Sequence, residues 1–166
     1  MYRKILSGIL ACAGLCGVSQ AGDVPDVKTG LWETKTTTSD ASKPIQIETM
    51  CTSTALLQTL YDSRLKNSDM PCKQLNVTRS GNTISDQMEC KFGDKVIKTK
   101  SVTVVTGDTA VHSEIHQDGK STIVVSDSRY LHACPPGMQL GDFVGADGAK
   151  FNILHPEHAR APAKSP

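Results

Sequence analysis

The chain has 166 residues, with 18 basic and 17 acidic side chains and only 4% aromatic residues. Because the two signs of charge nearly balance, the chain lacks the strongly basic surface of nucleic-acid-binding proteins, and we expect no nucleic-acid partner. The scarcity of aromatic side chains indicates a modest core, which disulfide bonds would reinforce by restricting the unfolded chain.

The N-terminus has the pattern of a secretory signal peptide. Arg3 and Lys4 are followed by an uncharged, apolar run over 5–18, and small residues lead up to a cleavage site after Ala21. The stretch that ends at Cys12 also resembles a lipoprotein cleavage site, and we expect membrane association only if Cys12 is lipidated. The chain then divides into a signal peptide, a single α+β domain and a flexible C-terminal tail, over 1–21, 22–143 and 144–166.

Beyond the cleavage site, apolar residues alternate with polar ones, which is the pattern of half-buried β-strands. Turn-forming pairs such as Gly81-Asn82 and Gly107-Asp108 separate the runs, and connections this short join antiparallel strands. One segment, 53–65, instead repeats its leucines at helical spacing. The predicted fold class is α+β, a curved, mostly antiparallel sheet of about seven strands with one amphipathic helix packed on it. The predicted strands are 30–38, 44–50, 73–78, 83–91, 96–106, 109–116 and 121–131.

Four cysteines lie beyond the cleavage site, and they allow three pairings. If 80–82 form the loop of a hairpin, Cys72 falls opposite Cys90 at a separation that a disulfide accepts. The alternation of the two strands then requires a shift of one residue in their register. We predict the pair Cys72–Cys90, which leaves Cys51–Cys134 as a long-range link. No two cysteines have the C-x-x-C spacing of a redox or zinc site.

The other polar residues do not converge on a catalytic or metal site. His112 and His116 share a face of one predicted strand, but four strand residues span about 13 Å, too far for one metal ion. His155 and His158 lie in the predicted tail, and two histidines alone lack the further ligands of a zinc site. The chain has no Gly-x-Ser-x-Gly motif around a nucleophilic serine. We therefore expect no enzymatic activity, no metal and no cofactor.

Several short motifs occur in an order that resembles a known family. They are Thr29-Gly30-Leu31-Trp32-Glu33, Met50-Cys51, the hairpin from Cys72 to Cys90, and Ser128-Arg129-Tyr130-Leu131 with Cys134-Pro135. This order is similar to the domain of unknown function 3617, over about Lys28 to Asp142. The chain departs from the family at His132-Ala133, where a Gly-Asp or similar pair is commoner. Members look like exported proteins of Gram-negative bacteria, so the resemblance implies the periplasm but carries over no functional residue.

Two classes of function fit these features. A curved sheet with one helix encloses a concavity, and such concavities hold small apolar or amphiphilic ligands. The alternative is a structural or interaction protein of the cell envelope that meets another protein through a sheet edge or its tail. For the binding module, the predicted lining of the ligand pocket is Trp32, Val102, Val104, Ile115, Ile123 and Val125.

Overall fold

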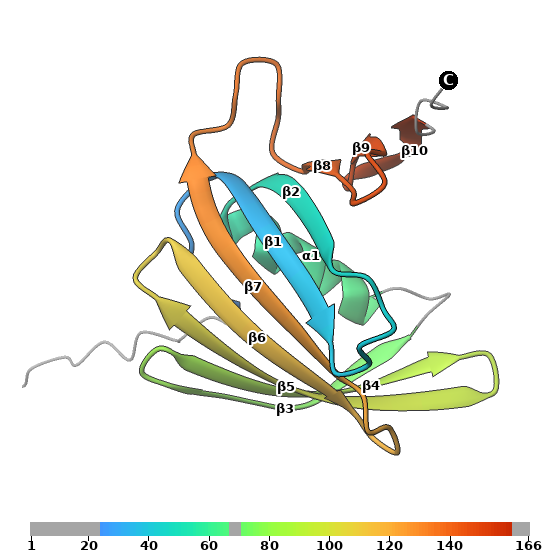
Figure 1. Cartoon of the computed structure of the whole chain (residues 1–166). Coiled ribbons are helices and arrows are strands. Elements are labelled where there is room, and N and C mark those ends of the chain that lie inside the picture. The colour runs from blue at the N-terminus through green and yellow to red at the C-terminus, as the bar shows by residue number, and fades with distance from the viewer. Residues whose placement is uncertain (1–23, 67–70, 161–166) are drawn as a thin grey trace, which may run out of the picture.

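The computed structural model describes residues 24–66 and 71–160, which form one helix and one continuous antiparallel sheet (Figure 1). The ten strands lie in the order β10-β9-β8-β2-β1-β7-β6-β5-β4-β3. The antiparallel sheet and the single helix are confirmed, with three strands more than the seven predicted. The elements are β1 (Gly30–Thr38), β2 (Gln46–Thr52), α1 (Thr54–Lys66), β3 (Cys72–Ser80), β4 (Thr83–Phe92), β5 (Lys95–Thr106), β6 (Ala110–Gln117), β7 (Ile123–His132), β8 (Asp142–Val144), β9 (Lys150–Asn152) and β10 (His155–Arg160).

The sheet curves around α1, so that β2, β1 and β7 pass on one side of the helix while β3, β4 and β5 cross on another (Figure 1). The helix reaches both halves: Leu57 borders a cavity together with Trp32 of β1, and Tyr61 Oη donates a hydrogen bond of 3.3 Å to Asp86 of β4. We call the face toward the helix the inner face and the opposite one the outer face. Side chains alternate along each strand. The inner face therefore consists of Trp32, every second residue of β1 counted from it, and the residues that lie opposite these on the successive neighbouring strands.

The helix begins one residue later than predicted because Ser53 caps it. Ser53 Oγ accepts a hydrogen bond of 3.2 Å from the backbone N–H of Leu56, which is the role of an N-cap residue. The Leu56 side chain is buried, whereas Thr59 on the far side of the helix is exposed. Arg64 lies in the last turn, where its positive charge complements the helix dipole. One side of α1 therefore packs onto the sheet, and the other faces solvent.

Trp32 anchors the start of β1 in the core. Its Nε1 donates a hydrogen bond of 2.8 Å to the carbonyl of Lys28, and its ring meets Tyr130 edge to face with centroids 6.0 Å apart. A Cβ on Gly30 would lie 2.5 Å from both the Tyr130 ring and the carbonyl oxygen of His132, so only glycine permits this approach of β1 to β7. The buried apolar residues are Val24, Leu31, Trp32, Cys51, Leu56, Cys72, Ile84, Met88 and Val105.

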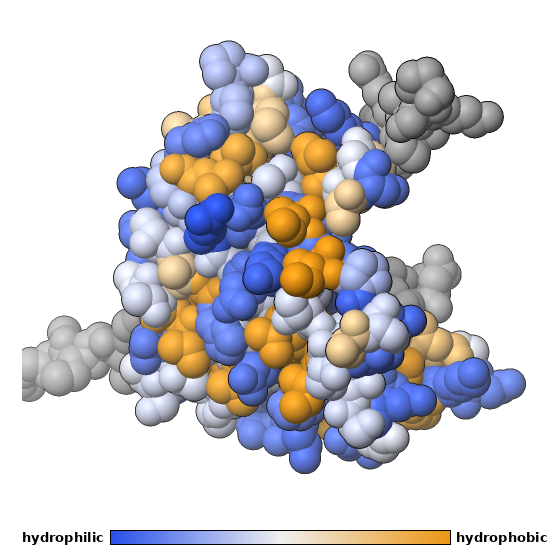
Figure 2. Space-filling view, viewed as in Figure 1, coloured by the Kyte–Doolittle hydropathy of each residue, from blue (hydrophilic) through white to orange (hydrophobic). Residues whose placement is uncertain are grey.

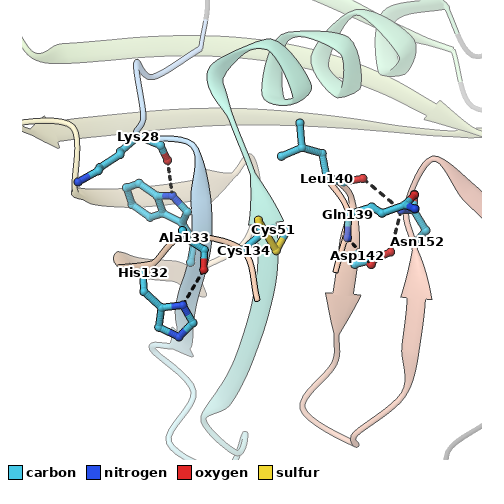
Figure 3. Close-up of a disulfide and its surroundings, with 10 residues drawn as sticks. Lys28, Cys51, His132, Ala133, Cys134, Gln139, Leu140, Asp142 and Asn152 are labelled. Carbon is cyan, nitrogen blue, oxygen red and sulfur yellow. Dashed lines mark hydrogen bonds between the residues drawn. A yellow bond between two sulfur atoms is a disulfide. The ribbon is translucent and has the colours of Figure 1, made fainter. Parts of the chain in front are cut away.

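Both predicted disulfides are confirmed. Cys51 at the end of β2 is fully buried and bonds to Cys134, which follows β7 and lies 83 residues away in sequence (Figure 3). Cys72 and Cys90 lie directly opposite each other on β3 and β4. The register shift that this pairing requires occurs at Leu75, which has no partner on β4 and is 45% exposed. One link therefore joins the edge strand β3 to its neighbour β4, and the other joins β2 to the segment that follows β7.

The sheet continues into the region where we predicted a flexible tail, 144–166. As far as residue 160 this region forms β9 and β10, while β8 pairs with β2. The backbone N–H of Gly141 donates a hydrogen bond of 2.8 Å to the carbonyl of Cys51. Asn152 Nδ2 donates one of 2.8 Å to Asp142, as Figure 3 shows. Composition concealed these strands because they are short and follow from the pairing of β8 with β2, which is distant in sequence, while β9 pairs with β8 and β10 with β9.

The predicted signal peptide, residues 1–21, lies outside the described residues, and so does Cys12. Among the described residues, α1 is the one helix, and it has neither the length nor the apolar character to cross a membrane. Export and lipidation therefore stay predictions.

Candidate ligand-binding site

The six residues that we predicted to line one pocket are divided between the two faces of the sheet. Trp32 and Ile115 belong to the inner face, where Ile115 lies opposite Val124 of β7. The register places the other four at the alternate positions of their strands, on the outer face: Val102, Val104, Ile123 and Val125. The six therefore do not line one pocket. The reason is that valine and isoleucine occupy both alternate sets of β5 and β7, so composition alone could not assign the face.

Four hydroxyl side chains form a row across the inner face, one on each of four neighbouring strands. Thr36 of β1 lies opposite Ser126 of β7, Ser126 opposite Ser113 of β6, and Ser113 opposite Thr103 of β5. The Oγ atoms of Thr36 and Ser126 are 3.3 Å apart, and those of Thr103 and Ser113 are 2.9 Å apart. All four residues are half-buried. We call Thr36, Ser126, Ser113 and Thr103 the hydroxyl row.

Each hydroxyl pair retains one unused O–H donor. A serine or threonine hydroxyl has one donor and two acceptor lone pairs, so a bond between two hydroxyls consumes one of their two donors. Thr34 and Ser128, with Oγ atoms 2.8 Å apart, form a third pair beside the row. Within the described part of the chain, these six hydroxyls make no further hydrogen bond. The inner face thus offers free hydrogen-bonding groups to water or to a ligand.

On one side of the hydroxyl row, α1 covers the inner face. A cavity of about 160 Å³ remains under the helix, and Trp32, Met50, Leu57 and Val111 supply most of its apolar wall. Its small volume and its neighbours in the core indicate a packing space rather than the main site for a ligand.

On the other side of the row, the inner face opens to solvent in two adjoining recesses of about 240 and 360 Å³. Thr36 and Thr38 line the first, Ile115 and Val124 line the second, and Thr122 lines both. We call the two recesses together the open trough. Its floor combines aliphatic groups with hydroxyls, and its charged side chains are all exposed: Asp40, Lys43 and Lys120.

A protein-family model described as Protein of unknown function (DUF3617) matches residues 27–134. The chain belongs to the DUF3617 family. The resemblance seen in the sequence motifs is thereby confirmed, and the DUF3617 region contains α1, β1 to β7, both disulfides and the whole open trough. Strands β8 to β10 lie beyond it. Neither the curated proteins nor the solved structures include a match to this chain.

The outer face of the DUF3617 domain carries ion pairs in place of hydroxyl pairs. His112 Nδ1 lies 2.7 Å from Asp127 Oδ1 and its Nε2 lies 3.6 Å from Glu114, while Arg129 pairs with Glu33 at 2.8 Å. The hydrogen bond that the His112 ring donates to the Asp127 carboxylate raises the pKa of His112 above its ordinary value. Charged and apolar residues are interspersed where this face is seen in Figure 2. Within the described residues, no three His, Cys, Asp or Glu side chains are placed to share a metal ion.

The sequence analysis missed the hydroxyl row of the DUF3617 domain because single serines and threonines are common in strands and turns. A usable signal was present in their spacing. Thr34, Thr36 and Thr38 occupy every second position of one strand, and Ser126 and Ser128 do so in another. Since every second residue shares a face, the two runs predict two lines of hydroxyls, but only the pairing of β1 with β7 makes them neighbours.

Proposed function

We propose that this DUF3617 domain is a non-enzymatic binding module that holds a small amphiphilic ligand in the open trough. The observation that carries the proposal is the composition of the trough floor, where the aliphatic side chains of Ile115 and Val124 adjoin half-buried hydroxyls. Concave surfaces with apolar walls and a few polar groups are typical of ligand sites.

The energetics favour an amphiphile over a pure hydrocarbon. Apolar ligand surface that covers Ile115 and Val124 would gain about 25 cal/mol per Å² removed from water. The same ligand would also separate the hydroxyl row from water, and an unsatisfied buried donor costs about 1–3 kcal/mol. A ligand avoids that cost if its apolar part leaves Thr36 and Ser113 open to water, or if it carries an oxygen acceptor to which the unused O–H groups donate.

The partners of these hydroxyls support binding rather than catalysis. An activated serine or threonine needs a base within hydrogen-bonding distance. Here Ser113 and Thr103 bond to each other, as do Thr36 and Ser126, while His112 lies on the outer face. This arrangement supports our proposal that the trough holds its ligand without chemical change.

We further propose that the protein acts in the periplasm. The support is that four cysteines lie beyond the predicted signal peptide and form two disulfides, Cys51–Cys134 and Cys72–Cys90. Disulfides form and persist in oxidising compartments, of which the bacterial periplasm is one.

Native mass spectrometry of the protein purified from its own cells, without denaturation, tests the binding function. We expect an added mass that disappears when the protein unfolds. The matched variants are Val124→Trp, which fills the trough, and Val125→Trp, which places the same ring on the outer face one residue away. Val124→Trp should lose the added mass and Val125→Trp should keep it. A bare wild-type protein with both disulfides formed would argue against bound ligand.

The second candidate is an interaction protein of the cell envelope, and one observation favours it. The strands beyond the DUF3617 match carry Phe143 and Phe151 with ring centroids 4.9 Å apart, beside a surface recess of about 460 Å³. Aromatic residues are enriched where proteins meet. If the wild-type protein is bare, and if Phe143→Ser abolishes co-purification of an envelope protein, this candidate replaces the first.

A further inference from the structure

We propose that the ligand of the open trough is a single-chain amphiphile with a monoanionic, carboxylate-type headgroup that lies between Lys43 and Lys120. This inference rests on the proposed function and specifies the chemistry of its ligand. It places the apolar chain against Ile115 and Val124 and the headgroup at the solvent-exposed end.

The two lysines belong to neighbouring turns that are tied together. Lys43 follows β1 in the turn where its own N–H bonds to the carbonyl of Asp40, and Lys120 lies in the turn before β7. Ser39 joins the two turns: its N–H donates a hydrogen bond of 2.9 Å to the carbonyl of Ile123, and its Oγ accepts one of 2.9 Å from the N–H of Ile123. The backbone therefore holds both lysine-bearing turns at the same end of the trough before any ligand arrives.

Both ammonium groups are available for an anion. Lys43 lines one recess and Lys120 the other, and the recesses meet at Thr122. Within the described residues, neither lysine forms an ion pair. The Thr122 hydroxyl adds a neutral donor between them. A carboxylate at this point would accept hydrogen bonds from charged donors, which are about twice as strong as those from neutral donors.

The charged residues that line the recesses carry a single net positive charge. Asp40 is the one acid that lines the recesses, and its Oδ1 accepts hydrogen bonds from Ser42 Oγ at 2.7 Å and from Ser42 N–H at 3.0 Å. Asp86, in the inner-face row that contains Ile115, accepts a hydrogen bond from Tyr61. Two lysines and one aspartate at the rim complement a monoanion, whereas a phosphate monoester carries close to two negative charges near neutral pH.

Isothermal titration calorimetry with two probes of equal chain length tests the inference. Sodium laurate carries the carboxylate, and glycerol monolaurate is its neutral counterpart, both used below their critical micelle concentrations. We expect the wild-type protein to bind laurate about fivefold more tightly, the ratio expected for two exposed ion pairs. The double variant Lys43→Gln with Lys120→Gln should lose this preference and still bind the monolaurate. Lys35→Gln with Lys100→Gln removes the same charge from the outer face and should keep it.

Equal affinity of the wild-type protein for the two probes would overturn the inference. So would an equal loss of preference in the outer-face variant, because that result would mean that overall charge, rather than position, decides. Failure of the binding function itself has a different signature: neither probe would bind, or Val124→Trp would bind both as tightly as wild type. The headgroup site would be supported if the wild-type protein and the outer-face variant prefer laurate, the Lys43→Gln with Lys120→Gln variant does not, and laurate binds more weakly at higher salt.

Discussion

The inner and outer faces of β5, β6 and β7 differ in how their polar side chains find partners. On the inner face neutral hydroxyls bond to each other, as Thr103 does with Ser113 at 2.9 Å. On the outer face charged groups pair, as His112 does with Asp127 at 2.7 Å. The two kinds of pair therefore come from adjacent positions of the same strands.

The cost of dehydration explains the difference. Removing a charged group from water costs far more than removing a hydroxyl that keeps a hydrogen bond. Within the described residues, the hydroxyl row is half-buried, while Asp127 is 59% exposed at its side chain. A concave face that is to exchange water for a ligand is better built from hydroxyls, and the contrast between the faces supports the inner one as the binding surface.

The largest expected difference between the faces is in packing. Trp32→Ala should lower the free energy of unfolding by about 3–5 kcal/mol, because it removes a large side chain that is only 4% exposed. Val102→Ala, on the outer face at 42% exposure, should change it by less than about 0.5 kcal/mol. Urea unfolding of the oxidised proteins measures both. Comparable losses in the two variants would contradict the assignment of the faces.

A smaller difference is expected for the hydroxyls. Ser113→Ala removes one member of a half-buried pair and should lower the free energy of unfolding by about 0.5–1.5 kcal/mol. Ser85 is the matched control, since it faces outward opposite Val102 and has no side-chain hydrogen bond in the described part of the chain. Ser85→Ala should therefore leave the urea midpoint almost unchanged. If both variants unfold at the same urea concentration, the row contributes nothing to stability.

The smallest effect concerns the outer-face histidine. Because the pKa of His112 is raised in the folded state, its pair with Asp127 stabilises the fold fully below the unfolded pKa of about 6.5 and loses that effect as the pH rises through the folded pKa. Asp127→Asn should lower the pKa of His112 measured by NMR. It should also lower the melting temperature slightly in acid and hardly at all in alkali.

Asp94→Asn is the control for that titration, because Asp94 lies in the exposed turn between β4 and β5. It should leave the His112 titration as it is in the wild-type protein. An unchanged His112 titration in Asp127→Asn would contradict the ion pair between His112 and Asp127 on the outer face.

Part of the fold was predictable because the signals were local. The hairpin turn at Gly81-Asn82 set Cys72 opposite Cys90, and the leucine spacing after Ser53 marked the helix. The C-terminal strands were not predictable in this way. Strands β8 and β9 have three residues each. β8 depends on its pairing with β2, and β9 on its pairing with β8 and on the bonds of Asn152, rather than on any repeated pattern of their own.

The sequence predicted that a concave face exists, but it predicted only part of the lining of that face. A curved sheet crossed by one helix implied a concave face, and Trp32 and Ile115 do lie on it. Val102 and Val125 lie on the other face because β5 and β7 carry aliphatic residues at both alternate sets of positions.

The sequence by itself determined the antiparallel sheet, the single helix, the pair Cys72–Cys90 and membership of the DUF3617 family, because each depends on spacing along the chain. The pair Cys51–Cys134 then followed by elimination. Tertiary structure alone decided which residues face the helix and which hydroxyls meet across strands. A shift of one residue in register would move every side chain of a strand to the other face. The observed register buries Trp32, Ile84 and Val105, which lie on three different strands, and no local pattern of the sequence connects these residues.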